Sequence, residues 1–321
     1  MQTSRTARYI LRRSAVPYVL RQAARFQRQR QFTSASSRLR QETHDPRLKD
    51  VDNIIHDQFS ILRSDYQAPK HPIILAHGLL GFDELHIAGS KLPGIEYWYG
   101  IREALAARDI EAITATVPPS GSIEARAKKL SEDIERKAGG KAVNIIAHSM
   151  LKPPNVVVKS LTTISTPHRG SAFADHMFKY IGLANLPKIY KALEFFGFET
   201  GAFEQLTQRY MAESFNPRTP DLEGVKYYSY GALLQPRLTS VFRKSHKIIE
   251  RIEGPNDGLV SVASSKWGTY KGTLDNVSHL DLINWTNRLR WYFWELTGHK
   301  RTFNAIAFYL DIADMLAKEG L

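Results

Sequence analysis

Three polar residues, far apart along the chain, have the types needed for nucleophilic acyl transfer. Ser149 follows a run of apolar residues, Val143–Ala147, as expected where a buried strand delivers a nucleophile into a sharp turn. Asp257 lies in the turn-forming sequence 254–258, and His279 follows a polar, strand-like stretch. Such chemistry needs a hydroxyl, an imidazole that takes its proton and a carboxylate that orients the imidazole. The chain offers one candidate for each role.

Each of these residues alone is weak evidence. Asp257 could be an ordinary solvated turn residue, and His279 could be an ordinary loop histidine. The order Ser149, Asp257, His279 is the nucleophile, acid, base order of the α/β-hydrolase fold, and it differs from the orders in the chymotrypsin-like and subtilisin-like folds. The combination therefore favours a serine esterase of that fold.

A tetrahedral intermediate also needs backbone N–H donors for its oxyanion. The segment His77–Gly81 directly follows the first predicted strand, and its glycines allow the backbone to turn towards the site. We expect the N–H groups of Leu79 and Met150 to form this oxyanion hole.

Short β-branched runs alternate with helical patterns, which is typical of βαβ units and a parallel sheet. Ser122 and Gly139 are candidate caps of one of the helices. The pattern predicts an α/β fold with a mostly parallel, doubly wound sheet. The expected strands are 73–76, 112–117, 143–147, 156–164 and 225–230, and the expected helices are 97–108 and 123–137.

The remaining segments suggest a domain organisation. We expect a disordered leader over 1–40, a polar linker over 41–70 and an α/β-hydrolase domain over 71–321. The aromatic-rich insert 172–222 either packs on the core or forms a lid over the substrate. Residues 285–321 are expected to form C-terminal helices. Their apolar face favours core docking over contact with a membrane surface, and it comprises Trp285, Leu289, Tyr292 and Trp294.

The formal net charge of +12 is concentrated at the N-terminus. Residues 1–40 hold ten arginines and no acid, whereas residues 41–321 hold 34 Lys and Arg against 32 Asp and Glu. The near-neutral body indicates no nucleic-acid partner. The leader is typical of a mitochondrial transit peptide cleaved near Phe32, with a disordered basic arm as the alternative. The chain has no cysteine, which excludes disulfides and thiolate metal sites.

Several motifs together resemble those of the Pseudomonas/Burkholderia-type triacylglycerol lipases, and with the leader they most resemble the fungal mitochondrial members of that family. The motifs are 77–81, 147–150, 165–171, 256–260 and 279–281. The resemblance implies hydrolysis of long-chain acyl esters at a lipid–water interface, without a cofactor, and is compatible with peripheral membrane contact. It implies Ser149 as nucleophile, Asp257 and His279 as its partners, Leu79 and Met150 as oxyanion donors, and the insert as lid.

Bacterial members of this family often bind a structural calcium ion. Asp281 matches one carboxylate position, but no second carboxylate is identifiable. Calcium takes about six to eight oxygen ligands, so one aspartate does not make a site. We predict no metal site.

The chain departs from the family pattern directly after the nucleophile. In the family, two glycines and a helix of about a dozen residues follow the serine, whereas here Leu151 to Asn155 lead straight to Val156. A crossover between parallel strands normally takes about 10–12 residues. We expect this loss to misplace the Met150 N–H, to impair hydrolysis and to expose apolar surface on one face of the sheet.

Two alternatives remain open. The chain could be an inactive relative that binds a lipid or a partner. It could also keep the chemistry with another acyl substrate, as a phospholipase, thioesterase or acyltransferase.

Overall fold

The computed structural model describes residues 53–78, 84–85, 95–98, 100–118, 121–148, 155–179, 204–236, 240–284 and 303–321. All of them belong to one compact unit, Arg47–Leu321. The predicted leader, the connection that contains Ser149 and part of the insert lie outside the described residues.

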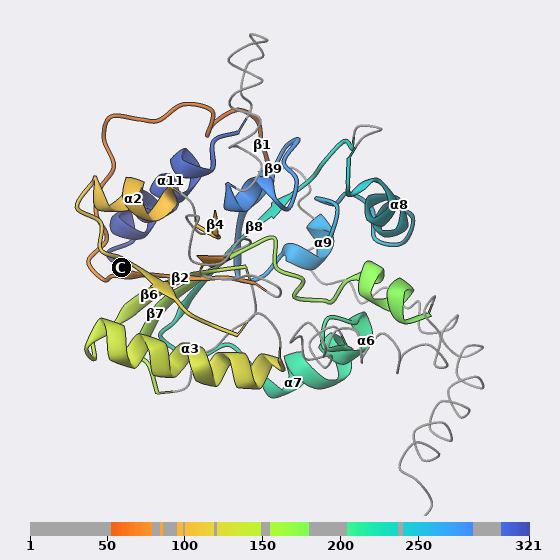
Figure 1. Cartoon of the computed structure of the whole chain (residues 1–321), viewed down its shortest axis with the longest axis horizontal. Coiled ribbons are helices and arrows are strands. Elements are labelled where there is room, and N and C mark those ends of the chain that lie inside the picture. The colour runs from red at the N-terminus through yellow and green to blue at the C-terminus, as the bar shows by residue number, and fades with distance from the viewer. Residues whose placement is uncertain are drawn as a thin grey trace, which may run out of the picture. The chain divides into compact units, whose positions relative to one another are not determined.

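A seven-stranded sheet forms the centre of the described unit, and each neighbouring pair of its strands is parallel. The strand order is β1-β9-β8-β7-β6-β2-β5 (Figure 1). This architecture confirms the predicted α/β fold. The strands are β1 (Ile54–Ile55), β2 (Ile73–Ala76), β5 (Ala112–Ala115), β6 (Val143–Ala147), β7 (Val158–Ile164), β8 (Lys226–Ala232) and β9 (Thr269–Leu274), and a separate antiparallel pair is formed by β3 (Glu84–Leu85) and β4 (Ile95–Glu96).

Helices cover both faces of the sheet (Figure 1). Alternate residues of a strand point to opposite faces, so Ile73 and Leu75 pack with α2 and α11, whereas Ile74 and Ala76 pack with α3. The helices are α2 (Ile101–Ala106), α3 (Ile123–Ala138), α6 (Gln208–Tyr210), the π-helix η3 (Met211–Phe215), α7 (Asn216–Arg218), α8 (Arg243–Ile252), α9 (Val262–Ser265), the 3-10 helix η4 (Asp281–Ile283) and α11 (Ala305–Lys318). None of the helices described is long and apolar enough to cross a bilayer.

The predicted caps of α3 are confirmed. The Ser122 side chain accepts a hydrogen bond from the Ala125 N–H, and Gly139 ends the helix with a φ of 58°. The helix starts where it was predicted to start and runs one residue further. Local capping chemistry is enough to define this element.

Strands β6 and β7 are parallel neighbours although the chain between them is short. β6 has its predicted bounds, whereas β7 begins at Val158, two residues later than predicted. The connection 148–157 therefore has ten residues. Extended, ten residues reach about 33 Å, which exceeds the length of about 17 Å of a five-residue strand. The return to β7 is thus possible without a crossover helix.

The prediction of an exposed sheet face is wrong for the strand residues that the structure describes. Val143, Ile145 and Leu161 are buried on the face that carries α3. Met211 and Phe215 of the insert pack into the same apolar cluster. The insert therefore supplies cover that we expected to be lost with the helix, whereas Val157, just before β7, is exposed, at 58%.

The predicted linker over 41–70 also needs correction, because its second half is part of the domain. β1 pairs with β9 at the edge of the sheet. The ring of Phe59 packs edge-on against Phe308 of α11, with 5.1 Å between the ring centroids. Arg63 forms ion pairs with Asp311 and Asp314 on the same helix. The polar composition of the segment did not indicate these contacts, because the partners of Arg63 lie about 250 positions away in the sequence.

Of the C-terminal segment 285–321, the structure describes residues 303–321, which include α11. α11 buries Phe308, Tyr309, Ile312 and Leu316 in the core. The face made by Trp285, Leu289, Tyr292 and Trp294 lies outside the described residues. Of the insert, residues 172–179 are helical and 208–218 pack on the sheet, whereas 180–203 lie outside the description.

We predict that Phe59→Ala lowers the free energy of unfolding by about 3–5 kcal/mol, because it removes a buried ring that anchors the N-terminal segment to α11. Ile61→Ala, two positions away at a side chain that is 76% exposed, should change it by less than about 0.5 kcal/mol. Urea unfolding followed by circular dichroism measures both. Equal effects of the two substitutions would restore the linker interpretation.

Candidate active site

The candidate functional residues gather at the carboxyl edge of the parallel sheet. His77 follows β2, His148 follows β6 and Ser165 follows β7. Asp257 lies between α8 and α9, and His279 lies in the loop after β9. Ligands of open α/β sheets bind at this edge, because loops from several strands meet there.

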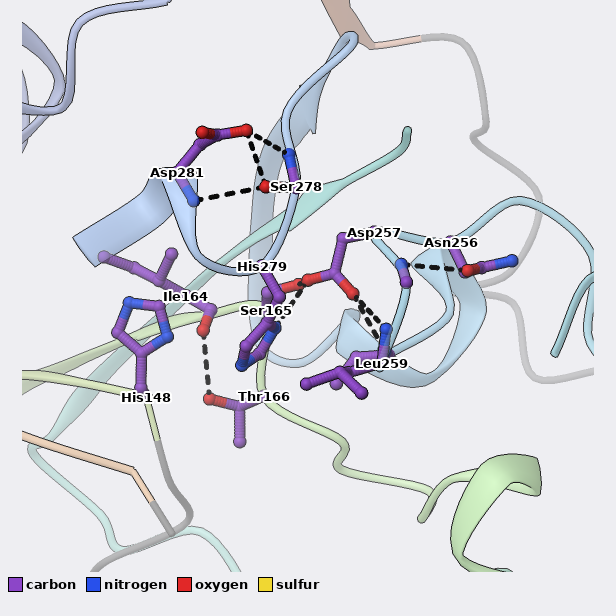
Figure 2. Close-up of polar contacts among 12 residues, drawn as sticks. His148, Ile164, Ser165, Thr166, Asn256, Asp257, Leu259, Ser278, His279 and Asp281 are labelled. Atoms are coloured by element: carbon purple, nitrogen blue, oxygen red, sulfur yellow. Dashed lines mark hydrogen bonds and ion pairs between the residues drawn. The ribbon is translucent and has the colours of Figure 1, made fainter. Parts of the chain in front are cut away.

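The structure brings the predicted acid and base into contact (Figure 2). His279 Nδ1 and Asp257 Oδ2 are 2.6 Å apart. The backbone N–H of His279 also donates to the carbonyl oxygen of Asp257, at 3.1 Å. A proton held on Nδ1 by the carboxylate leaves Nε2 of the same ring as the basic nitrogen. This pair can therefore take a proton from a hydroxyl.

Asp257 is fully buried, so it is not a solvated turn residue. Its second oxygen, Oδ1, accepts hydrogen bonds from the N–H groups of Leu259, at 2.9 Å, and Val260, at 2.8 Å. Asn256 Oδ1 accepts a hydrogen bond from the Gly258 N–H and so shapes the same turn. Buried carboxylates are stable in the charged form only with such donors.

Ser165 belongs to the candidate site through its contact with Asp257, a contact that the sequence did not predict. Its buried hydroxyl donates to Asp257 Oδ2 at 2.5 Å, the same oxygen that faces His279 (Figure 2). The residue has a φ of 46°, which is unusual for a residue other than glycine and costs about 1–3 kcal/mol. A polar residue directly after the predicted strand 156–164 was the available signal, but its backbone conformation was not foreseeable.

A second imidazole lies beside His279. The rings of His148 and His279 are 5.7 Å apart and nearly perpendicular, and His148 Nε2 lies 3.2 Å from the Tyr309 hydroxyl oxygen. Burial, together with the neighbouring charge of His279, holds the pKa of His148 well below its ordinary value. His148 is therefore neutral, which leaves His279 as the candidate proton acceptor of the site.

The loop after β2 packs closely against the end of β6. A Cβ atom on Gly78 would lie 2.8 Å from the carbonyl oxygen of His148, so only glycine allows this approach. The buried guanidinium of Arg126 donates to the carbonyl oxygens of His77 and Gly78, and burial lowers its pKa to about 10. The chain segments that lead into Leu79 and Ser149 are thus adjacent.

Ser149, Leu79 and Met150 themselves lie outside the described residues. Asp281, the candidate calcium ligand, accepts hydrogen bonds from the backbone N–H and the hydroxyl of Ser278 and so stabilises the turn after His279 (Figure 2). Within the described part of the chain, no cluster of three or more His, Cys, Asp or Glu side chains could hold a metal ion.

The pKa of His279 follows from its surroundings. Burial alone would lower it, but the charge of Asp257 and the hydrogen bond to that carboxylate raise it above its ordinary value. Because the neutral form is the base, the site gains its proton-accepting capacity only as the pH rises through this raised pKa.

The fold defines the class, an α/β-hydrolase, here with a carboxylate–imidazole pair, Asp257 and His279, at the carboxyl edge of its sheet. The solved Staphylococcus hyicus lipase shares this fold, with a TM-score of 0.56 and 17% identity over 79% of this chain and 98% of that chain. No family model matches the sequence.

Comparison with curated proteins gives the family. Triacylglycerol lipase 2 of Saccharomyces cerevisiae is 37% identical over 84% of this chain and 98% of its own length. A triacylglycerol lipase of Vibrio cholerae is 26% identical over 70% of this chain and 83% of its own length. The chain belongs to the family of triacylglycerol lipases.

We predict that Ser165→Ala raises the pKa of His279 further, because a carboxylate that loses a donor becomes a stronger base and holds the imidazolium more tightly. It should also lower the free energy of unfolding by about 1–3 kcal/mol. NMR titration of the His279 ring and chemical denaturation measure the two effects.

Two further substitutions distinguish the effect of the lost Ser165 hydroxyl from the effect of the strained backbone at that position. Ser165→Gly should raise the pKa of His279 as much as Ser165→Ala while destabilising less, because glycine tolerates the positive φ. Ser160→Ala removes another buried hydroxyl, bonded to Asn144 Oδ1 at 2.8 Å, and should leave the titration unchanged. Identical titrations of the Ser165 and Ser160 variants would contradict this assignment.

Proposed function

We propose that this chain hydrolyses long-chain acyl esters, triacylglycerols among them, by serine chemistry. The observation that supports it most is the contact between His279 Nδ1 and buried Asp257, beside His148, the residue that precedes Ser149 in the chain. Membership of the triacylglycerol lipase family also supports the hydrolysis of acyl esters.

The proposed reaction has two steps. The Ser149 hydroxyl attacks the ester carbonyl while His279 Nε2 takes its proton, and this proton then passes to the departing alkoxide. Water, deprotonated by the same imidazole, then attacks the acyl-enzyme, and the proton passes to the Ser149 oxygen as its bond to the acyl group breaks and the fatty acid leaves. Asp257 stabilises the imidazolium, and the N–H groups of Leu79 and Met150 are proposed to receive the oxyanion.

We predict that Asp257→Asn lowers kcat by about 10⁴-fold, because the imidazole loses its tautomer and its charge partner. Asp275→Asn is the matched control, since Asp275 Oδ2 also contacts an imidazole, that of His56, at 2.9 Å, but on an exposed surface. Hydrolysis of emulsified triacylglycerol measures both, with Ser149→Ala as the blank. Hydrolysis that survives Ser149→Ala would overturn the proposed nucleophile.

The substrate class is tested on the same preparations. Triacylglycerol, phospholipid and acyl thioester are offered side by side at equal acyl-chain length. A preference for triacylglycerol supports the proposal. Preference for either of the others would reassign the chain to the corresponding acyl substrate.

We also propose that the short connection 148–157 limits turnover, because the few residues between Ser149 and Val156 leave no room for the crossover helix that would aim the Met150 N–H. Loss of one oxyanion donor costs about 10²–10³-fold in turnover. Insertion of a Gly-Gly-led helical segment of about twelve residues after Met150 should therefore raise kcat by at least about 10²-fold. Equal kcat with and without the insertion would refute this limit, whereas no hydrolysis by either would refute the enzyme itself.

We propose that residues 1–40 direct the chain to mitochondria, since ten arginines and no acid give the segment the composition of a transit peptide. Fused to a fluorescent protein, this segment should bring the fusion into mitochondria, and replacing all ten arginines by glutamine should abolish import. Microscopy and protease protection measure the outcome. Cytosolic fluorescence of the unaltered fusion would contradict the proposal.

A further inference from the structure

Helix α8 has a predominantly basic surface, although its one acid, Glu250, is also exposed. Its four basic side chains, Arg243, Lys244, Lys247 and Arg251, are all exposed, and within the described residues none of them forms an ion pair. The single acid of the helix, Glu250, faces His246 at 3.8 Å. Since residues 41–321 are nearly neutral as a whole, this concentration of charge is local to α8.

Exposed aliphatic side chains border the basic surface. Val241, one residue before the N-cap of α8, is 82% exposed, and Ile252, the last residue of the helix, is 60% exposed. The helix therefore presents apolar and cationic groups to solvent together.

The helical repeat sorts these groups into strips. At about 100° per residue, the four basic residues share one arc of the helix, and Ile248 and Ile252 lie together, four positions apart, beside that arc. Ser245, His246 and Ile249 face the core. Around the helix axis, the core-facing residues are thus followed by the aliphatic strip, Ile248 and Ile252, and then by the strip of four basic residues. Helices that lie in a membrane interface have this arrangement.

The position of α8 links this surface to the active site. The helix lies at the outside of the described unit, near α9 (Figure 1). Directly after it, Glu253 accepts a hydrogen bond from the Ala172 N–H of the insert, and the chain then runs through Gly254 to Asp257. A surface that contacts α8 is therefore held next to the loop that carries the acid of the site.

We propose that α8, with Val241 and Ile252, docks the protein on membranes rich in anionic phospholipid. The four cations contact lipid phosphates, and the aliphatic strip enters the boundary between headgroups and acyl chains. The proposal goes beyond ester hydrolysis, and its test needs no turnover.

The absence of cysteine allows a helix-specific measurement on the full chain. Ile252→Cys and, as control, Ile61→Cys, which is also strongly exposed, each receive one environment-sensitive fluorophore. Vesicles of phosphatidylcholine with about 30% phosphatidylserine should shift the emission of the α8 label to the blue and leave the Ile61→Cys label unchanged. Because the basic leader is present in both proteins, its own binding does not produce this difference.

Charge neutralisation tests the cause. Changing Arg243, Lys244, Lys247 and Arg251 to glutamine in the Ile252→Cys protein should weaken the vesicle-induced shift by at least about 10²-fold in lipid concentration, since each cation near an anionic surface contributes about fivefold. The matched control removes the same charge from around α3, by glutamine at Lys128, Lys129, Arg136 and Lys141, and should leave the shift intact.

Four results would overturn the proposal. The first two are an emission shift of the Ile61→Cys label as large as that of the Ile252→Cys label, and an equal weakening of the shift by the α8 and the α3 glutamine sets. The other two are a shift of the Ile252→Cys label with pure phosphatidylcholine, or with a soluble polyanion such as heparin, as large as with the anionic vesicles. The last result would assign α8 to acidic polymers instead. If the protein shows the vesicle-induced shift but does not hydrolyse esters, the proposed enzyme is refuted and the proposed docking surface is not.

Discussion

The buried carboxylate of Asp257 is the constraint on which the arrangement of the site depends. A buried charge is stable only when its oxygens are satisfied. Here four donors come from three segments. They are the Ser165 hydroxyl after β7, the ring of His279 after β9, and the N–H groups of Leu259 and Val260 in the turn of Asp257 itself. These segments must therefore adopt their positions together. One of the hydrogen bonds that stabilise the Asp257 carboxylate comes from the His279 ring, so the same bond orients the imidazole. A base with a fixed tautomer is the functional result.

Sequence reasoning succeeded where the physical cause is local. β2 and β6 have their predicted bounds because each is a short run of buried β-branched and apolar residues, and α3 was located by its cap residues, Ser122 and Gly139. The pairing of Asp257 with His279 was predicted from chain order, which reflects the order of the loops at the sheet edge. The role of Ser165 was missed, because it depends on a positive φ and on a partner 92 positions away.

The two structural errors have a common origin. Residues 41–70 were assigned to a linker because of their polar composition. The sheet was expected to lose cover because the sequence after Ser149 is too short for a crossover helix. In both cases a segment far away in the sequence supplies the contact. Phe308 packs against Phe59, and Met211 and Phe215 pack on the face of β6 and β7. Apolar composition shows that a surface must be covered but does not identify the element that covers it.

This distinction also separates the stability of the protein from its catalysis. A crossover helix after a nucleophile covers the sheet, and it aims the N–H of its first turn at the oxyanion. The first task is non-directional, so any apolar side chain of suitable size can perform it, as Met211 and Phe215 do here. The second task is directional, because a hydrogen bond weakens steeply once donor and acceptor are misaligned. The ten-residue connection between β6 and β7 is therefore compatible with an intact parallel sheet and an intact Asp257–His279 pair, whereas the packing that covers the sheet does not by itself aim an N–H group at an oxyanion.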